Sequence, residues 1–392
     1  MWWKYLCRWN CRKYDNVRYI TCKSLYKDTK DKSTKEITQK KIIKIQKTKI
    51  AKDKFQETKE VLKNAAGEIS NFGCNNVYKR GVKLEFKHKS VLLEETIKGL
   101  NIKPNGIYVD GTLGGAGHSK QILKQLSPEG LLIGIDRDTE ALNAAKENLK
   151  EFQNVKYVHG NHDEIEEILE NLGIEEVDGI LLDLGVSSYQ LDERERGFSY
   201  LGNNELDMRM DKTQNLTAKE VVNNYPEEKL ANIIYEYGEE RFSRQIAKNV
   251  CIYRKTKEIE TTEELVQIIE KSMPAFAKKD GHPAKRTFQA IRIEVNDEIK
   301  PLYETVRKCI KHLKTGGRLA IITFHSLEDR AVKNAYVDAQ GKCTCPKDLP
   351  YCVCGAVSEG KIINKKPIIA TKEEQEENSR SKSAKLRIFE KI

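Results

Sequence analysis

The chain has 392 residues, of which 33% are charged and 39% hydrophobic, and its formal net charge is +10 at pH 7. This length suffices for one large or two ordinary domains with a real hydrophobic core, and no apolar run approaches the length of a membrane span. The charge is uneven, because residues 1–83 hold 22 Lys and Arg against 8 Asp and Glu, whereas the remainder holds 47 against 51. The net charge is therefore no argument for nucleic-acid binding by the folded part.

Residues 1–83 are Lys-rich and polar, and such a composition buries little apolar surface. One interpretation is a basic arm for nucleic acid, and another is a transit peptide, although the stretch is poor in Ser. A third is that the stretch lies outside the native protein. We favour the third, because no Met lies between Met1 and Met208 and a domain-like pattern starts at Leu84, which a UUG or CUG start codon could specify. A purine-rich ribosome-binding sequence can encode residues 79–81, just before it. The intact mass of the native protein would test it.

From residue 86 onward, short apolar runs alternate with segments of helical period. The pattern predicts strands at 107–110, 131–136, 155–159 and 178–184, and helices near 90–100, 118–126, 138–151 and 163–172. This alternation indicates an α/β fold with a doubly wound parallel sheet.

Residues 191–290 interrupt the alternation, since strand-like runs vanish and the segment is polar and helical in pattern. Thr261 and Glu264 form a capping box before an apolar helix face. We interpret this segment as an inserted helical domain. A helix at 295–313 and strands at 318–324 and 385–392 then return to the sheet. The expected divisions are an extension at 1–83, a core in two parts at 84–190 and 291–392, the insert at 191–290, and a Cys-rich loop at 343–354.

A glycine-rich turn, DGTLGGAGHS at residues 110–119, follows the first strand and opens a helix. Glycines let a ligand approach the backbone closely. The spacing is a poor match to G-x-G-x-x-G, and Asp110 in the turn would repel a pyrophosphate, so a cationic ligand without phosphate, such as S-adenosylmethionine, fits better. Asp136 closes the second strand, where an acid can accept hydrogen bonds from ribose hydroxyls. Asp183 closes the fourth, so three acids are expected to converge on one sheet edge.

Several ordered motifs carry a resemblance to a known family. Besides the glycine-rich turn, they are IDRD, DGILLDLGVSS, LDMRMD, YGEERF, HPAKRTFQAIRIEVNDE, GGRLAIITFHSLEDR and SRSKSAKLR. Over roughly 86–392 the chain resembles the RsmH/MraW family, S-adenosylmethionine-dependent methyltransferases that act on N4 of a cytidine in small-subunit (16S) ribosomal RNA near the decoding site. The resemblance implies a Rossmann-like methyltransferase core with an inserted helical domain.

The resemblance also implies site residues. The family's cofactor contacts fall on Ala116, Gly117, His118, Asp136, His162, Asp183 and Gln190. Position 162 is a departure, because many members have an aromatic residue such as Phe there, although an imidazole can still stack on adenine. Asp183 is also the candidate catalytic residue, since it could accept a hydrogen bond from the target amine. A backbone carbonyl of residues 184–185 is the alternative.

RNA contacts are expected on the insert and the strand-end loops. The substrate-binding candidates are Arg209, Lys285, Arg286, Gln289 and Arg292; further cations are Arg194, Arg196 and Arg330, and aromatics that could stack on bases are Phe198, Tyr200 and Phe288. For any one of them, a solvated charge or a core aromatic is the commoner explanation. Arg209 could equally belong to a salt-bridged turn with Asp207 and Asp211.

No secretory signal is apparent, so we expect the ten cysteines to be in a reducing cytosol, without a disulfide framework. Cys251 and Cys309 are isolated in helical patterns and are expected to be buried thiols. Four others, Cys343, Cys345, Cys352 and Cys354, are enough for tetrahedral zinc, but the C-x-C spacing is shorter than the usual C-x2-C. We assign no metal, and metal analysis would decide.

These observations together predict a cytoplasmic bacterial rRNA cytosine-N4 methyltransferase. Its cofactor would be S-adenosylmethionine, and its partner would be small-subunit rRNA within an assembled or assembling subunit. One rival is a methyltransferase of the same fold that acts on another nucleic acid or a small molecule. A second is a non-catalytic assembly factor with a vestigial cofactor pocket.

Overall fold

The computed structural model describes residues 90–278, 281–341, 345–346, 351 and 357–392. The chain divides into two units, Met1–Glu85 and Phe86–Ile392, and every described residue belongs to the second. The predictions made for residues 1–83 therefore lie outside the described residues. Within the described part, every helix is too short or too polar to cross a membrane.

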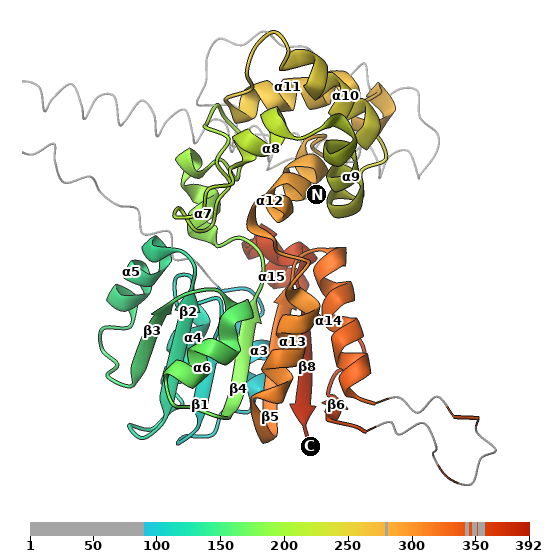
Figure 1. The fold of residues 1–392 in the computed structure, drawn as a ribbon. Coiled ribbons are helices and arrows are strands. Elements are labelled where there is room, and N and C mark those ends of the chain that lie inside the picture. The colour runs from blue at the N-terminus through green and yellow to red at the C-terminus, as the bar shows by residue number, and fades with distance from the viewer. Residues whose placement is uncertain (1–89, 279–280, 342–344, 347–350, 352–356) are drawn as a thin grey trace, which may run out of the picture. The chain divides into compact units, whose positions relative to one another are not determined.

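One mainly parallel sheet forms the centre of the core (Figure 1). Its strands follow the order β3-β2-β1-β4-β5-β8-β6, and β7 pairs with β8. Their bounds are β1 Ile107–Asp110, β2 Leu131–Asp136, β3 Val155–His159, β4 Val177–Asp183, β5 Leu313–Thr323, β6 Gly360–Ile362, β7 Ile368–Ile369 and β8 Lys385–Lys391. Strands β1 to β5 pair in parallel, and β8 is antiparallel to β5, β6 and β7. The predicted doubly wound sheet is confirmed, and its topological switch point lies between β1 and β4.

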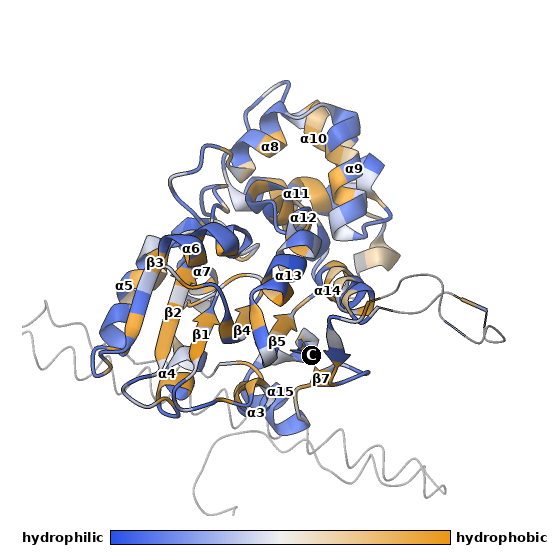
Figure 2. Cartoon of the chain, turned by 60° about the horizontal axis from the view of Figure 1, so that its bottom comes forward, coloured by the Kyte–Doolittle hydropathy of each residue, from blue (hydrophilic) through white to orange (hydrophobic). Residues whose placement is uncertain are grey.

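Helices cover both faces of the sheet, because successive strand residues point to opposite faces. One face carries α3 Leu93–Leu100, α4 Gly117–Leu123 and α5 Thr139–Asn148; the other carries α6 Ile165–Asn171, α13 Leu302–Lys311 and α14 Ser326–Ala339. The side chain of Leu132 packs with the apolar residues of the first face, and that of its neighbour Ile133 packs with those of the second face. Both are fully buried. Figure 2 shows the apolar strands β1, β2 and β4 between helices that also carry polar residues.

The insert follows β4 and has a hydrophobic core of its own. Its helices are α7 Ser188–Asp192, α8 Ala218–Asn224, α9 Glu227–Gly238, α10 Ser243–Tyr253, α11 Thr262–Ser272 and α12 Lys285–Asn296, with 3-10 turns η2 Arg194–Arg196 and η3 Ala275–Lys278. Buried side chains from Phe198 to Val295 form one cluster. Helix α11 begins at the predicted capping box of Thr261 and Glu264.

The predicted helix at 295–313 is wrong, since the structure has two helices there. Helix α12 ends at Asn296 because Asp297 adopts a left-handed backbone, with φ of 47°, and α13 begins only after Pro301. A left-handed residue and a proline both stop a helix. The boundary expected at residue 290 falls inside the continuous α12, so we propose that the insert ends at Asn296.

The remaining elements complete the core after α14. They are α15 Lys372–Glu377 and the 3-10 turn η4 Ser379–Ser383. A further 3-10 turn, η1 His162–Glu164, lies between β3 and α6. The strand expected at 385–392 is confirmed as β8, which lies between β5 and β6. Glu374 of α15 accepts a hydrogen bond from the amide of Leu92 at 2.8 Å, which joins this late segment to the start of α3.

Candidate functional site

Three acidic residues end neighbouring strands, as the sequence predicted. Asp110, Asp136 and Asp183 are the last residues of β1, β2 and β4, and β1 pairs with both of the others. The carboxyl ends of parallel strands meet at one edge of a sheet, where α/β proteins bind their ligands. The structure thus brings the three carboxylates to one edge.

Asp110 is part of the scaffold of this edge. It is 2% exposed, and its carboxylate accepts hydrogen bonds from the Ser119 hydroxyl at 2.6 Å and the Thr112 amide at 3.2 Å. Burial raises the pKa of Asp110 to about 6. These contacts tie β1 to the glycine-rich turn and to the first turn of α4.

The glycine-rich turn bends around the carboxylate of Asp136. This carboxylate accepts hydrogen bonds from the amides of Gly114 at 2.7 Å and Asp138 at 2.8 Å. Gly114 and Ala116 both have left-handed backbones, with φ of 49° and 61°, and a non-glycine residue at such a φ is uncommon. A Cβ added at Gly115 would meet no atom of the described part of the chain within 4 Å. The turn therefore leaves open space over its backbone, beside an acid at the sheet edge.

Asp183 holds an unpaired buried oxygen. Its amide donates to the Thr112 hydroxyl at 2.6 Å, but Oδ1 is buried and has no hydrogen-bond partner among the described residues, while about a quarter of the side chain remains accessible. Burial, together with the nearby charges of Asp110 and Glu328, raises the pKa of Asp183 well above its usual range. Buried polar atoms normally have partners, so this oxygen is suited to a ligand that supplies a donor.

His118 lies between α3 and Asp183. Its Nε2 is 3.0 Å from the carbonyl oxygen of Val91, and its Nδ1 is 3.7 Å from Oδ2 of Asp183. A carbonyl can only accept, so Nε2 carries the hydrogen and Nδ1 faces the carboxyl group. His118 is buried, and Gly117 beside it approaches Ser90 so closely that a Cβ there would overlap the serine hydroxyl.

Glu328 approaches the same edge from the first turn of α14. Its Oε2 accepts from the amides of Phe324 and His325, and Oε1 lies 3.0 Å from His325 Nε2. Burial alone would raise the pKa of Glu328, but the hydrogen bond and charge of His325 and the charge of Arg292 hold it below its usual range. A Cβ added at Gly185 would come within 3.6 Å of the Phe324 ring and 3.9 Å of Glu328. This turn therefore forms a wall of the edge.

The ligand atoms of Glu298, His325 and Glu328 lie within 4.8 Å of one another, which is close enough for a metal ion. Both carboxylates already have partners, because Arg292 forms two hydrogen bonds to Glu298, at 2.8 and 2.9 Å, and Glu328 caps α14. We interpret this group as an ion-pair cluster that fixes the turn after β5.

His162 lies against the glycine-rich turn. A Cβ added at Gly111 would be 3.1 Å from the His162 Cβ. Burial, and secondarily the charge of Arg137, lowers the pKa of His162 to about 3. The imidazole is therefore neutral at physiological pH, and a neutral aromatic ring can stack on a base.

We expect a His162→Phe variant to be less sensitive to acid than the wild type. The ordinary histidine pKa is 6.5 and the folded value is about 3, so the unfolded chain takes the proton first and stability is lost as pH falls from about 6.5 toward 3. In this window the wild-type free energy of unfolding should fall with decreasing pH more steeply than that of the variant, by up to about 1.4 kcal/mol per pH unit. Urea unfolding at pH 5 to 6.5 measures both slopes, and equal slopes would contradict the expectation.

Gln190 is engaged inside the protein. Its Oε1 accepts from the Ser187 amide at 3.0 Å and its Nε2 donates to Asp138 at 2.9 Å. Ser187 and Gln190 form a capping box at the start of α7. The side chain is 4% exposed, so the structure places it beneath the sheet edge, where it supports the turn that follows Asp136.

The five candidate RNA contacts do not share one environment. Arg209 forms an ion pair with Asp207 and donates to the carbonyls of Lys212 and Gln214, which favours the salt-bridged turn. Arg292 is held by Glu298. Gln289 donates to the Tyr237 carbonyl at 3.0 Å and Arg286 to the Glu239 carbonyl at 3.1 Å. Of the five, Lys285 and Arg286 are exposed, on the first turn of α12.

Several of the other residues expected to contact RNA are instead engaged in contacts within the protein. Phe198 and Phe288 are 7% and 4% exposed in the core of the insert, and Arg196 is buried in ion pairs. Tyr200 stacks on His282, with ring centroids 4.3 Å apart. Arg194 is exposed, and Arg330 pairs with Glu239 at the surface.

The cysteine predictions are confirmed in part. Cys251 and Cys309 are buried free thiols, and burial raises the pKa of Cys309 to about 12. Of the four clustered cysteines, Cys345 lies within the described residues and is partly buried. The other three, and with them the zinc question, lie outside the described residues.

The sequence reasoning missed Asp138 and Glu328. Asp138 caps α5 by accepting from the Glu140 amide at 3.0 Å, and an Asp two residues after the strand-end acid is a recognisable capping signal. Glu328 belongs to a capping box whose first residue is His325. Histidine is an unusual first residue, so this signal is weaker.

Comparison with known proteins gives one consistent result. The model of the MraW methylase family matches residues 85–392. The chain is 59% identical over 309 residues to "Ribosomal RNA small subunit methyltransferase H" of Clostridium botulinum (strain 657 / Type Ba4), covering 79% of this chain and 100% of that protein. It is 57% identical over 314 residues to the protein of the same name from Lachnospira eligens, covering 80% and 100%. A solved rRNA methylase from Streptococcus thermophilus shares 11% identity and a TM-score of 0.35 over 76% of this chain and 93% of that one, which is too distant to add weight. This chain belongs to the MraW methylase family.

Proposed function

We propose that this chain transfers the methyl group of S-adenosylmethionine to N4 of a cytidine in small-subunit ribosomal RNA. Its curated relatives are named as methyltransferases of that RNA. The observation that carries the choice of acceptor is the buried, unpaired Oδ1 of Asp183 at the sheet edge. An exocyclic amine supplies the N–H donor that this oxygen lacks.

The residues at the edge fit S-adenosylmethionine. Asp136 and Asp183 end β2 and β4, and two acids suit a ligand with an ammonium and a sulfonium group and no phosphate. In this proposal Asp136 accepts hydrogen bonds from the ribose hydroxyls. Gly115 leaves open space over the backbone of the turn that bonds Asp136, and the neutral ring of His162 suits adenine. When bound, the cofactor supplies an activated methyl group, so the protein need only bind, align and dehydrate the reactants.

Asp183 has a defined part in this proposal. The amine of cytosine is a poor nucleophile because its lone pair is delocalised into the ring. A hydrogen bond from the amine to Oδ1 of Asp183 localises that lone pair, and the amine must lose one proton once the new N–C bond forms. The raised pKa of Asp183 makes its carboxylate a better acceptor for this proton than an ordinary aspartate.

The acceptor base has to leave its stack to reach this edge. The Phe324 ring beside Gly185 offers an apolar wall for it, and the exposed Lys285 and Arg286 on α12 offer positive charge to the RNA backbone. We further propose that the partner is an assembled or assembling small subunit, and that the reaction takes place in the cytoplasm.

Methyl transfer to small subunits that lack the mark tests the proposal. The full chain is incubated with labelled S-adenosylmethionine and unmodified subunits, and nucleosides are analysed by mass spectrometry. We expect N4-methylcytidine, and the same product from a chain beginning at Leu84. Absence of transfer by a chain that still binds cofactor would indicate another acceptor or a non-catalytic role.

A further inference from the structure

The turn after β2 contacts both the sheet edge and the insert. Asp136 lies at the sheet edge, and its Oδ1 accepts the amide of Asp138 at 2.8 Å. Asp138 is 2% exposed; its Oδ1 caps α5, and its Oδ2 accepts a hydrogen bond from Arg196 of the insert. A single hydrogen bond thus separates the proposed ribose-binding acid from a second buried acid.

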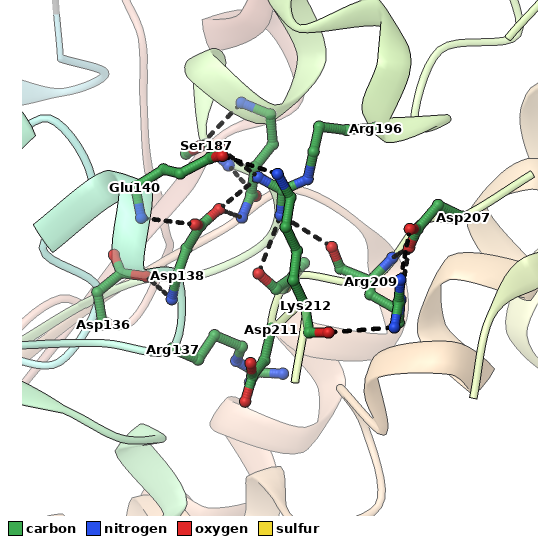
Figure 3. Close-up of polar contacts among 12 residues, drawn as sticks. Asp136, Arg137, Asp138, Glu140, Ser187, Arg196, Asp207, Arg209, Asp211 and Lys212 are labelled. Carbon is green, nitrogen blue, oxygen red and sulfur yellow. Dashed lines mark hydrogen bonds and ion pairs between the residues drawn. The ribbon is translucent and has the colours of Figure 1, made fainter. Parts of the chain in front are cut away.

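Arg196 joins Asp138 to the insert (Figure 3). Its Nη1 donates to Asp138 Oδ2 at 2.9 Å, and its Nη2 donates to the carbonyl oxygens of Arg209 at 2.9 Å and Met210 at 3.0 Å. Its side chain is 5% exposed. One guanidinium therefore connects the turn after β2 with residues 208–210 of the insert.

A second connection holds the same segment from the other side. Arg137 donates to the carbonyl of Asn296 at 3.1 Å. The Asn296 amide group in turn donates to the Met208 carbonyl at 2.8 Å and accepts from the Met210 amide at 2.7 Å. Two chains of hydrogen bonds, which start from the consecutive residues Arg137 and Asp138, thus hold residues 208–210.

We propose that Asp138 and Arg196 form a clasp through which an occupied cofactor site positions residues 208–210, and with them the insert, for RNA binding. Arg196 is a positioning residue in this scheme, since it acts through Asp138 and Asp136. The RNA part rests on the proposed function. A well-packed apolar pair would often be as stable as a buried ion pair, so stability alone gives little reason for buried charges here, whereas coupling two sites requires directional bonds.

Coupling of this kind is reciprocal. If cofactor tightens RNA binding by some factor, RNA must tighten cofactor binding by the same factor, and such factors are usually about 5 to 150. We expect a factor of about ten in the wild type and a factor near one in Arg196→Lys, because an ammonium cannot bond both Asp138 and two carbonyls in a planar fork. S-adenosylhomocysteine is the cofactor probe, and its affinity is measured with and without small subunits.

Hydrogen exchange tests the clasp without RNA. The Met208 amide donates to the Arg196 carbonyl at 3.0 Å and the Met210 amide to Asn296. In the full-length wild type, S-adenosylhomocysteine should slow exchange at both amides at least fivefold. Under saturating ligand, Arg196→Lys and Asp138→Asn should show less than twofold slowing. The side-chain amide of the second variant offers one oxygen, so it cannot both cap α5 and hold Arg196, yet asparagine is itself a good helix cap and the fold should persist.

Lys212→Ala is the matched control. Lys212 pairs with Glu140 at 2.7 Å between the same two segments, but both side chains are exposed, and exposed pairs contribute little. This variant should keep the wild-type protection. Equal protection in the wild type and both clasp variants would overturn the proposal, as would equal loss in Lys212→Ala. If the amide protection changes as expected but no N4-methylcytidine forms, the clasp is supported and the proposed cytidine acceptor is wrong.

Discussion

An Asp183→Asn variant should transfer methyl groups about 10³-fold more slowly at saturating cofactor, because general acid–base groups commonly contribute 10² to 10⁴. The amide keeps the size of the side chain but cannot take up the proton that the amine releases. Affinity for S-adenosylhomocysteine should change by less than about tenfold, since the other contacts of the edge remain. Single-turnover rates with unmodified subunits measure the first effect and calorimetry the second. A rate within threefold of the wild type would remove Asp183 from the reaction.

The same substitution should stabilise the protein. The pKa of Asp183 is raised on folding, so the folded chain holds the proton more tightly than the unfolded chain, and the stability contribution of this residue falls as pH rises above its ordinary value of 3.8. Removing the carboxyl group should therefore raise Tm at pH 7.5 by a few degrees, and less at pH 5. Asp110→Asn is a useful comparison. It also removes a buried acid, but the replaced group accepts bonds from Ser119 and Thr112, so a smaller gain is expected.

An Asp136→Ala variant should bind S-adenosylhomocysteine at least 100-fold more weakly. The carboxylate orders the glycine-rich turn through the amides of Gly114 and Asp138, and we propose that it also holds the ribose. Hydrogen bonds to a charged group are worth about 1.5–3 kcal/mol each, so losing one or two accounts for this factor. Isothermal titration calorimetry gives the affinity directly.

Two further variants make that result specific. Asp136→Asn keeps one acceptor oxygen and should fall between Ala and the wild type. Asp211→Ala removes an acid of the insert whose carboxylate bonds to Thr213 at 2.7 Å, and it should bind as the wild type does. Unchanged affinity in Asp136→Ala would mean that the ribose is held elsewhere.

The sequence was informative where the determinants are local. Apolar runs such as residues 131–135 predict strands, and an acid after each run predicts a shared edge, because parallel strands end together. Only one of the two causes of the break between α12 and α13 can be recognised in the sequence. Pro301 can be read from the sequence, but the left-handed backbone of Asp297 cannot.

Contacts between distant segments could not be predicted in this way. Arg196 and Asp138 are 58 positions apart and meet because the insert folds back over the turn after β2. Glu328 reaches Asp183 only because β5 pairs with β4. Charged side chains such as Arg209 and Arg292 have the same residue type whether they bind RNA or an internal acid, so their surroundings decide.

The pairing of β4 with β5 has a consequence for how the chain reaches this structure. Residues 184–312 separate the two strands in sequence, yet they are direct neighbours in the sheet. Closing a disordered loop costs entropy that grows with its length, by about 0.6 kcal/mol for each doubling. The insert has its own apolar cluster from Phe198 to Val295, so if it collapses first, most of that loop is already compact when β5 meets β4. The order of events would then be insert before sheet, and a variant that weakens the insert core should slow formation of the sheet as well as destabilise the insert.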